Sequence, residues 1–286
     1  MKLVTYDGGQ GPRLGLLSGD NVVDVASASN GALPADMRSF LEMGDAGLTQ
    51  ARGLTSASGL PVSSVRILAP ISNPSKIVAI GLNYMDHCRE QGIQPPTRPT
   101  TFTKFPSSII GPGDDIRWNP ELTSKVDWEV ELAVVIGKEA RNVSADNAFD
   151  VIAGYTICHD VSARDLQLEK GDQWIVGKSL DTFCPLGPVI VTKDEIADPH
   201  DLGLRCLVNG KAVQDSNTKE LIFNIPYLIE YLTKGITLLP GDVITTGTPD
   251  GVGAFLTPPI FLKDGDEVTV EIDGIGAMTN RCVEEK

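Results

Sequence analysis

Residues 126–132 (VDWEVEL) constrain the fold and the chemistry of this chain more than any other segment. Acidic and apolar residues alternate strictly, which predicts a strand with two unlike faces. Glu129 and Glu131 then lie roughly 6.6–7 Å apart on one face, which continues with the apolar residues Ala133 and Val135. Ionised carboxylates on a face that enters a core need a cation. This segment alone therefore supports a metal site about as well as a solvated strand face.

A third carboxylate ends the next strand-like run. Residues 151–160 (VIAGYTICHD) are typical of a buried strand that ends at Asp160, which is either a metal ligand or an ordinary turn residue. A helix predicted at 162–169 would place Arg164 and Gln167 on one side, toward whatever Asp160 faces. Three carboxylates without a cysteine–histidine cluster favour Mg²⁺ or Mn²⁺ over zinc.

A histidine and a glutamate have the spacing of an oriented general base. Residues 83–91 (NYMDHCREQ) are predicted to form a helix, on which His87 and Glu90 are three positions apart and share a face. A carboxylate there can hold the imidazole and raise its basicity. Taken alone, this spacing is better explained by an ordinary exposed pair on a helix than by an oriented general base. The residues that follow, 91–101 (QGIQPPTRPTT), resemble a mobile flap.

Strand-like runs outnumber helical ones along the chain. Short strands at 2–6, 14–17 and 21–25, a helix at about 36–50 and a Ser/Gly/Pro-rich stretch predict an accessory domain over 1–68 and a main domain over 69–286. The main domain has strand-like runs at 76–80, 126–136, 151–159, 187–192, 204–208, 242–246 and 267–272, and helices at 83–91, 162–169 and 223–233. Because these do not alternate as βαβ units, we expect an α+β fold, mainly β, with a mixed β-roll or β-sandwich core.

The charge balance excludes some partners. The chain has 24 basic and 38 acidic residues, a formal net charge of −14, which disfavours binding to nucleic acids or to anionic membrane surfaces. No apolar run is long enough to span a membrane, no signal peptide is visible, and the five cysteines are dispersed without a C-x-x-C pair. These features predict a cytoplasmic protein in a reducing compartment.

Several segments together resemble one enzyme family. They are GLNYMDHCRE, TKFPSSIIGPGD, DWEVELAVVIG, ICHDVSARDLQ, GKSLDTFCPLGP, NGKAVQDSNT and TTGTPDGVG, and they follow one another in this order over about 80–254. The chain is similar to the fumarylacetoacetate hydrolase superfamily, especially to the branch with oxaloacetate tautomerases and diketo-acid hydrolases. The resemblance implies a mixed β-roll built around a metal, usually in a homodimer.

The resemblance also implies a role for each candidate residue. It implies Mg²⁺ or Mn²⁺ at Glu129, Glu131 and Asp160, a substrate-facing cation at Lys178, substrate contacts from Arg164, Gln167 and Thr248, and a water-activating dyad of His87 and Glu90. The partner of such a site is a small anionic keto acid. The same cations would allow a protein with a net charge of −14 to bind it.

The leading functional hypothesis is metal-dependent hydrolysis of a carbon–carbon bond in a 2,4-dioxo acid, of the acylpyruvate or diketo-deoxy sugar acid type. His87 would activate water, and the metal and Lys178 would stabilise the enolate that cleavage leaves. The alternative is an oxaloacetate keto–enol tautomerase or decarboxylase, because both reactions share that enolate. A lyase or dehydratase of related acids and a non-catalytic metal-binding scaffold stay open as further classes.

Overall fold

One long mixed sheet runs through both predicted domains. The computed structural model describes residues 1–170 and 173–285, and in this part of the chain twelve strands form the sheet. Its main path is β4 (Leu60–Pro61), β3 (Asn21–Asp24), β2 (Pro12–Ser18), β1 (Lys2–Asp7), β14 (Cys184–Thr192), β12 (Ile152–His159), β11 (Val130–Ile136), β17 (Val243–Thr245), β6 (Ile77–Gly81) and β7 (Thr100–Lys104). Two further strands, β5 (Arg66–Leu68) and β8 (Ile109–Ile110), pair with β1 and β14.

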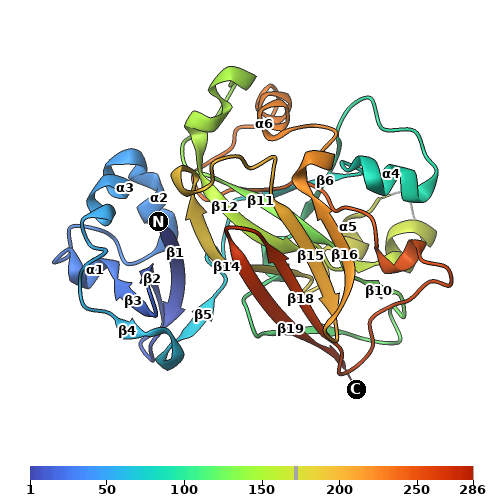
Figure 1. Cartoon of the computed structure of the whole chain (residues 1–286), viewed down its shortest axis with the longest axis horizontal. Helices are drawn as coiled ribbons and strands as arrows, with labels where there is room; N and C mark the ends of the chain where they lie inside the picture. Colours follow the sequence, from blue (N-terminus) through green and yellow to red (C-terminus); the bar gives the residue numbers. More distant parts are fainter. Residues whose placement is uncertain (171–172, 286) are drawn as a thin grey trace.

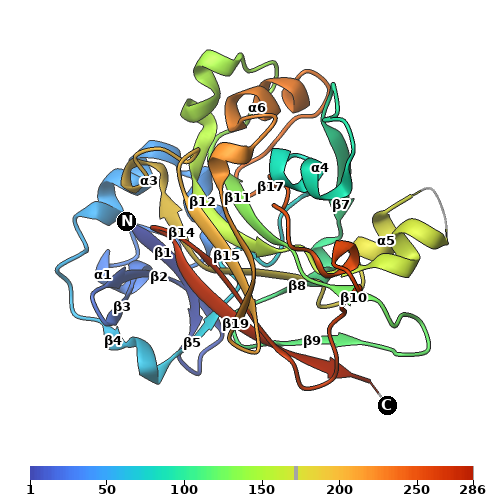
Figure 2. The same cartoon turned by 45° about the vertical axis from the view of Figure 1, so that its right-hand side comes forward.

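A five-stranded second sheet packs on the main-domain part of the first. It consists of β16 (Lys211–Asn217), β15 (Gly203–Val208), β18 (Glu267–Ile272), β19 (Gly276–Glu284) and β9 (Asp115–Trp118). In Figures 1 and 2 its strands lie beside β14, β12 and β11, and the buried side chains of both sheets form one apolar cluster. The predicted α+β, mainly β class with a roll or sandwich core is therefore confirmed.

The N-terminal residues form a group of their own around the start of the long sheet (Figure 1). The three predicted strands are present as β1, β2 and β3, and β1 joins β14 through the pairs Lys2–Val191 and Leu3–Ile190. The helix expected at 36–50 is wrong in detail, because Gly44, with a φ of 56°, separates α2 (Met37–Glu42) from α3 (Gly44–Arg52). The domain boundary near residue 68 stays a prediction.

Two other expected elements are interrupted where the site is built. The strand expected at 126–136 breaks at Trp128–Glu129 into β10 (Val126–Asp127) and β11. The helix expected at 162–169 begins instead as β13 (Ser162–Ala163), because its backbone pairs with β10, and only then turns into the wide helical turn η4 (Asp165–Glu169). The end of the expected flap belongs to β7, which pairs with β6.

The helices of the main domain are short and lie at the edges of the sheets. The expected helices at 83–91 and 223–233 are present as α4 (Met85–Gln91) and α6 (Ile225–Thr233). The remaining helical segments are α1 (Val25–Ala28), α5 (Ile175–Lys178), η1 (Val62–Ser64), η2 (Pro106–Ser108), η3 (Ala145–Val151), η5 (Lys193–Glu195), η6 (Thr218–Glu220) and η7 (Gly253–Phe255). Among the described residues, no helix has both the length and the apolar character needed to cross a membrane.

The two faces of β11 lead into two different cores. Leu132 and Val134 join the cluster between the sheets, whereas Ala133 and Val135 join a second cluster that also contains Phe40 of the N-terminal region. Because Glu131 shares the face of Ala133 and Val135, the expectation that the acidic face continues into the interior is confirmed.

Gly154 offers a test of how tightly β12, the strand that leads to Asp160, packs against β14. A Cβ at Gly154 would collide with the carbonyl oxygen of Val191 and lie 2.9 Å from Cγ2 of Ile190. We expect Gly154→Ala to lower the free energy of unfolding by about 1–3 kcal/mol, measured by urea denaturation. In the control, Gly235→Ala, the new methyl group meets nothing within 4 Å and should change stability by less than about 0.5 kcal/mol. Equal stability of the two variants would contradict this packing.

Candidate active site

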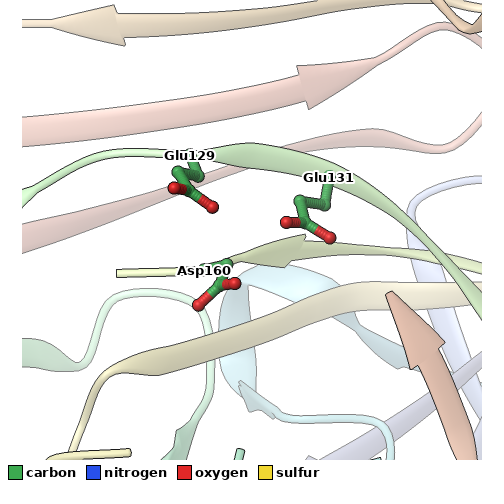
Figure 3. Close-up of side chains that lie close together, drawn as sticks. All are labelled: Glu129, Glu131 and Asp160. Carbon is green, nitrogen blue, oxygen red and sulfur yellow. The ribbon is translucent and has the colours of Figure 1, made fainter. Parts of the chain in front are cut away.

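Three carboxylates meet where β11 begins and β12 ends. These strands are antiparallel with Val130 opposite His159, and the backbone N–H of Asp160 donates to the carbonyl oxygen of Glu129 at 2.9 Å. Asp160 is thereby held across from Glu129, with Glu131 two residues further along β11. Figure 3 shows the three side chains around one space, and one oxygen from each lies within 4.8 Å of the others.

The charges around the three carboxylates are unequal. Burial alone would raise the pKa of Glu129, but Lys178 and Arg164 lower it to about 2. Burial raises the pKa of Glu131 well above its ordinary value, and the carboxylates of Asp160 and Glu129 raise it further. Glu131 accepts a hydrogen bond from the backbone N–H of Gly247 at 2.8 Å, and no lysine or arginine in the described chain forms an ion pair with it.

This imbalance fits a cation site. Glu129, Glu131 and Asp160 are all buried, and in the described chain Glu131 is the one of the three without a lysine or arginine at ion-pair distance. Because all the ligand atoms on offer are carboxylate oxygens, the donor set suits a hard divalent ion rather than zinc. The three residues present therefore fit the metal that the sequence predicts.

Two buried basic side chains face the carboxylates. Nζ of Lys178, at the end of α5, lies 2.8 Å from Oε2 of Glu129 and 3.0 Å from Oδ2 of Asp160. A guanidinium nitrogen of Arg164 lies 2.7 Å from Oε1 of Glu129, and another donates to Oε1 of Gln167 at 2.9 Å. Arg164 and Gln167 thus lie together as expected, although η4 is not the regular helix that was predicted.

His87 and Glu90 interact within α4. Nδ1 of His87 lies 3.0 Å from Oε2 of Glu90, and the other oxygen of Glu90 accepts the backbone N–H of Gly251 at 2.9 Å. The side chain of His87 is 6% exposed, so the explanation as an exposed surface pair is wrong. Its other nitrogen, Nε2, lies 2.8 Å from the amide nitrogen of Gln91.

A single cavity of about 100 Å³ joins these groups. Every predicted site residue lines it except Glu90 and Asp160, which lie behind His87 and Lys178. The full lining is Ile80, Gly81, Leu82, His87, Gln91, Phe102, Glu129, Glu131, Arg164, Gln167, Leu168, Trp174, Lys178, Thr248 and Phe255. The structure brings the predicted residues together, whereas their individual roles stay predictions.

Lys104 is the buried charge that the sequence analysis missed. Its ammonium donates to Oδ1 of Asp160 at 2.5 Å, to the carbonyl oxygen of Val161 at 3.2 Å and to the carbonyl oxygen of Lys178. Burial would lower the pKa of Lys104, but the neighbouring Asp160 raises it overall. Residues 100–104 (TTFTK) contain one apolar residue, Phe102, so no alternation in this segment indicates that Lys104 is directed inward.

Asp127 and Gln214 also hold the site in place. Asp127 accepts from Nε of Arg164 at 2.8 Å and from the backbone N–H of Gly253 at 2.7 Å. Gln214 accepts the N–H of Val130 at 2.9 Å and donates to the hydroxyl of Thr248 at 2.8 Å. Asp127 lies on the predicted acidic face, but no local pattern in the sequence indicates that Gln214 reaches the site.

The two packed sheets and the three buried carboxylates at the ends of β11 and β12 point to an enzyme with a site for a divalent cation. Residues 76–283 match the family described as "Fumarylacetoacetate (FAA) hydrolase C-terminal", and the chain belongs to this family. The resemblance predicted from the sequence is thereby confirmed.

Relatives extend the likeness over the whole chain. "Oxaloacetate tautomerase fahd2, mitochondrial" of Xenopus laevis is 51% identical over 99% of this chain and 90% of its own length. The solved fumarylacetoacetate hydrolase of Exiguobacterium antarcticum is 37% identical, with a TM-score of 0.87 and full coverage of both chains. The maleylpyruvate hydrolase of Sphingobium sp. SYK-6, solved with manganese(II) and pyruvate, is 32% identical, with a TM-score of 0.81 and full coverage of both chains.

The names of the relatives also correct one prediction. The Xenopus laevis protein and its human counterpart, which is 49% identical over 96% of this chain, are both named as mitochondrial. This finding contradicts the cytoplasmic location expected from the lack of a recognisable targeting segment, and that expectation is withdrawn.

Glu131→Gln tests the carboxylate cluster as a metal site. Loss of a residue that only orients a ligand typically weakens metal affinity about 10–100-fold. Replacing a direct carboxylate ligand by an amide of the same shape should therefore weaken Mn²⁺ binding at least about 100-fold, measured by isothermal titration calorimetry. The control is Glu121→Gln, an exposed acid outside the cluster, which should bind Mn²⁺ as the wild type does. Equal affinity of the Glu131→Gln protein would remove this residue from the ligand set.

Proposed function

We propose that this protein is a divalent-metal-dependent oxaloacetate tautomerase that interconverts the keto and enol forms of its substrate. The observation that carries the proposal is one small cavity that is lined by Glu129, Glu131, Lys178 and His87. Asp160 and Glu90 contact Lys178 and His87 from outside the lining. The extensive identity to the Xenopus laevis oxaloacetate tautomerase supports the choice of reaction.

Glu129, Glu131 and Asp160 are the residues that would hold the cation. When bound, a divalent ion polarises the carbonyl of a chelating 2-oxo acid as a Lewis acid. The Mn²⁺ in the Sphingobium enzyme supports manganese, and the all-oxygen donor set suits Mg²⁺ equally well.

His87 is the residue best suited to move the proton. In the keto form, the bond from C3 to hydrogen breaks as Nε2 of His87 takes the proton, and the electron pair forms the C2–C3 double bond. Glu90 accepts from Nδ1 and stabilises the imidazolium that results. Return of a proton to the C2 oxygen gives the enol, so the reaction consumes no co-substrate.

Lys178 is the cation of this chain that is available to the charge developing on the C2 oxygen. Its ammonium has three N–H donors, of which Glu129 and Asp160 take two, so one is left for a ligand. Arg164 adds positive charge next to the cavity. Because both side chains are already paired with buried carboxylates, a divalent ion would add the positive charge that a dianionic substrate needs in a protein with a net charge of −14.

Carbon–carbon bond hydrolysis, the leading hypothesis from the sequence, is the second candidate. The specific observation in its favour is the 32% identity to a maleylpyruvate hydrolase solved with pyruvate. Hydrolysis requires a water molecule activated by the same His87. We rank it second because the relatives named as tautomerases share about half of their residues with this chain.

The proposed function is tested with oxaloacetate and the metal-stripped protein. We expect added Mg²⁺ or Mn²⁺ to accelerate enol loss, followed by ultraviolet absorbance, without release of pyruvate. Lys178→Met should reduce the rate about 10²–10³-fold, because it removes a buried donor aimed at developing charge. Metal-dependent release of pyruvate from oxaloacetate would favour decarboxylation, and release from maleylpyruvate would favour hydrolysis.

We also propose that two copies of the chain associate. The strand β7 ends the path of the long sheet, and two exposed apolar side chains lie beside it: Phe105 (48% exposed) follows β7 directly, and Val176 (56% exposed) lies in the adjoining α5. Light scattering should give about twice the chain mass of 30.5 kDa. Val176→Glu should weaken the dimer, whereas the same change at exposed Ile260, in a different loop, should not. A mass of one chain for the wild type at micromolar concentration would refute the dimer.

A further inference from the structure

Both nitrogens of the His87 imidazole are engaged by residues of the same helix. Nδ1 lies 3.0 Å from the carboxylate of Glu90, and Nε2 lies 2.8 Å from the amide nitrogen of Gln91, the last residue of α4. Because a carboxylate only accepts hydrogen bonds, the proton of the neutral ring is on Nδ1. Nε2 then carries the lone pair, and the amide N–H of Gln91 donates to it. The nitrogen that must act as the base is therefore capped.

The cap lies in the substrate cavity. Gln91 lines the same cavity as Glu129, Glu131 and Lys178. Within the described part of the chain, the bond to His87 is the side-chain hydrogen bond that Gln91 makes. Its amide therefore has a second N–H and a carbonyl oxygen available to a ligand.

We propose that Gln91 is a specificity-determining residue, which uncaps His87 only for 2-oxo acids that carry a second carboxylate. This inference rests on the proposed function and deepens it. An N–H that donates to a carboxylate forms a stronger bond than one that donates to a neutral imidazole. The second carboxylate of a dicarboxylic oxo acid therefore draws the amide away from Nε2 and frees the lone pair. A 2-oxo acid with an apolar tail has no such group and leaves the base capped.

The cap also affects which reaction follows. A water molecule that approached Nε2 would compete with the Gln91 amide for the same lone pair, and as a neutral donor it has no advantage over that amide. Oxaloacetate instead has a second carboxylate that competes with Nε2 for the Gln91 amide. The same molecule carries the C3 proton that His87 removes. Without a second carboxylate in the cavity, the cap thus keeps water from the lone pair of Nε2.

Gln91→Met tests the cap, because methionine has a similar length but neither donates nor accepts as an amide does. Proton–deuterium exchange at C3 is followed by NMR for metal-loaded protein with oxaloacetate and with 2-oxobutanoate. We expect the wild-type preference for oxaloacetate, expressed as a ratio of kcat/KM values, to fall at least about 10-fold. Exchange of 2-oxobutanoate should be unchanged or faster. An unchanged ratio would overturn the proposal.

A readout that needs no turnover separates this inference from the proposed function. The chain has three histidines, so ¹⁵N-histidine labelling gives few signals to assign. The ligand 3,3-difluorooxaloacetate has both carboxylates and no C3 proton. In the wild type, the Nε2 signal of His87 should shift when this ligand binds and should not shift when pyruvate binds. In ligand-free Gln91→Met, the Nε2 signal should already differ from that of the ligand-free wild type. It should then respond equally to both ligands. If oxaloacetate is not tautomerised but these shifts occur, only the proposed function fails.

The matched control is Gln94→Met, the same change at an exposed glutamine three residues further along. It should keep both the wild-type exchange ratio and the wild-type Nε2 signal. A similar loss of preference in Gln94→Met and Gln91→Met would assign the effect to the segment as a whole, and would contradict a role for the Gln91 amide.

Discussion

The structure depends on the balance of buried charge around Glu129, Glu131 and Asp160. Carboxylates this deep in a protein are stable only with positive neighbours. Lys104, Lys178 and Arg164 supply those neighbours from three separate segments, and each makes direct contact with Glu129 or Asp160. The position of β7, of η4 and of α5 relative to the central strands is thereby tied to the electrostatics of the site.

Glu131 remains outside this balance, and that is informative. Glu129 and Asp160 are each met by basic side chains, whereas Glu131 has the backbone N–H of Gly247. A cation bound in the site would therefore find at Glu131 the carboxylate with the fewest positive contacts. The folded chain thus provides most of the positive charge that its own carboxylates need, and Glu131 is the place that suits an added cation.

Much of this site could be predicted from the sequence, because its central part is local. The alternation in residues 126–132, the spacing of His87 and Glu90 and the end of the run at Asp160 are short-range patterns. Lys104 and Gln214 could not be found in this way, because they reach the site through the pairing of β7 with β6 and of β15 with β16. The break between β10 and β11 also escaped prediction, because tertiary pairing with β13 overrides the continuous pattern.

The face of β11 that carries Glu131 also contributes to the second core, and this limits how far the chain could be shortened from its N-terminal end. Ala133 and Val135 share an apolar cluster with Phe40 and Leu41 of the N-terminal group. A chain that began at residue 69 would leave part of this cluster open to water, and the sheet that carries the site would need either polar substitutions or another covering element. The first 68 residues therefore help to support the strand that carries Glu131, although none of them lines the cavity.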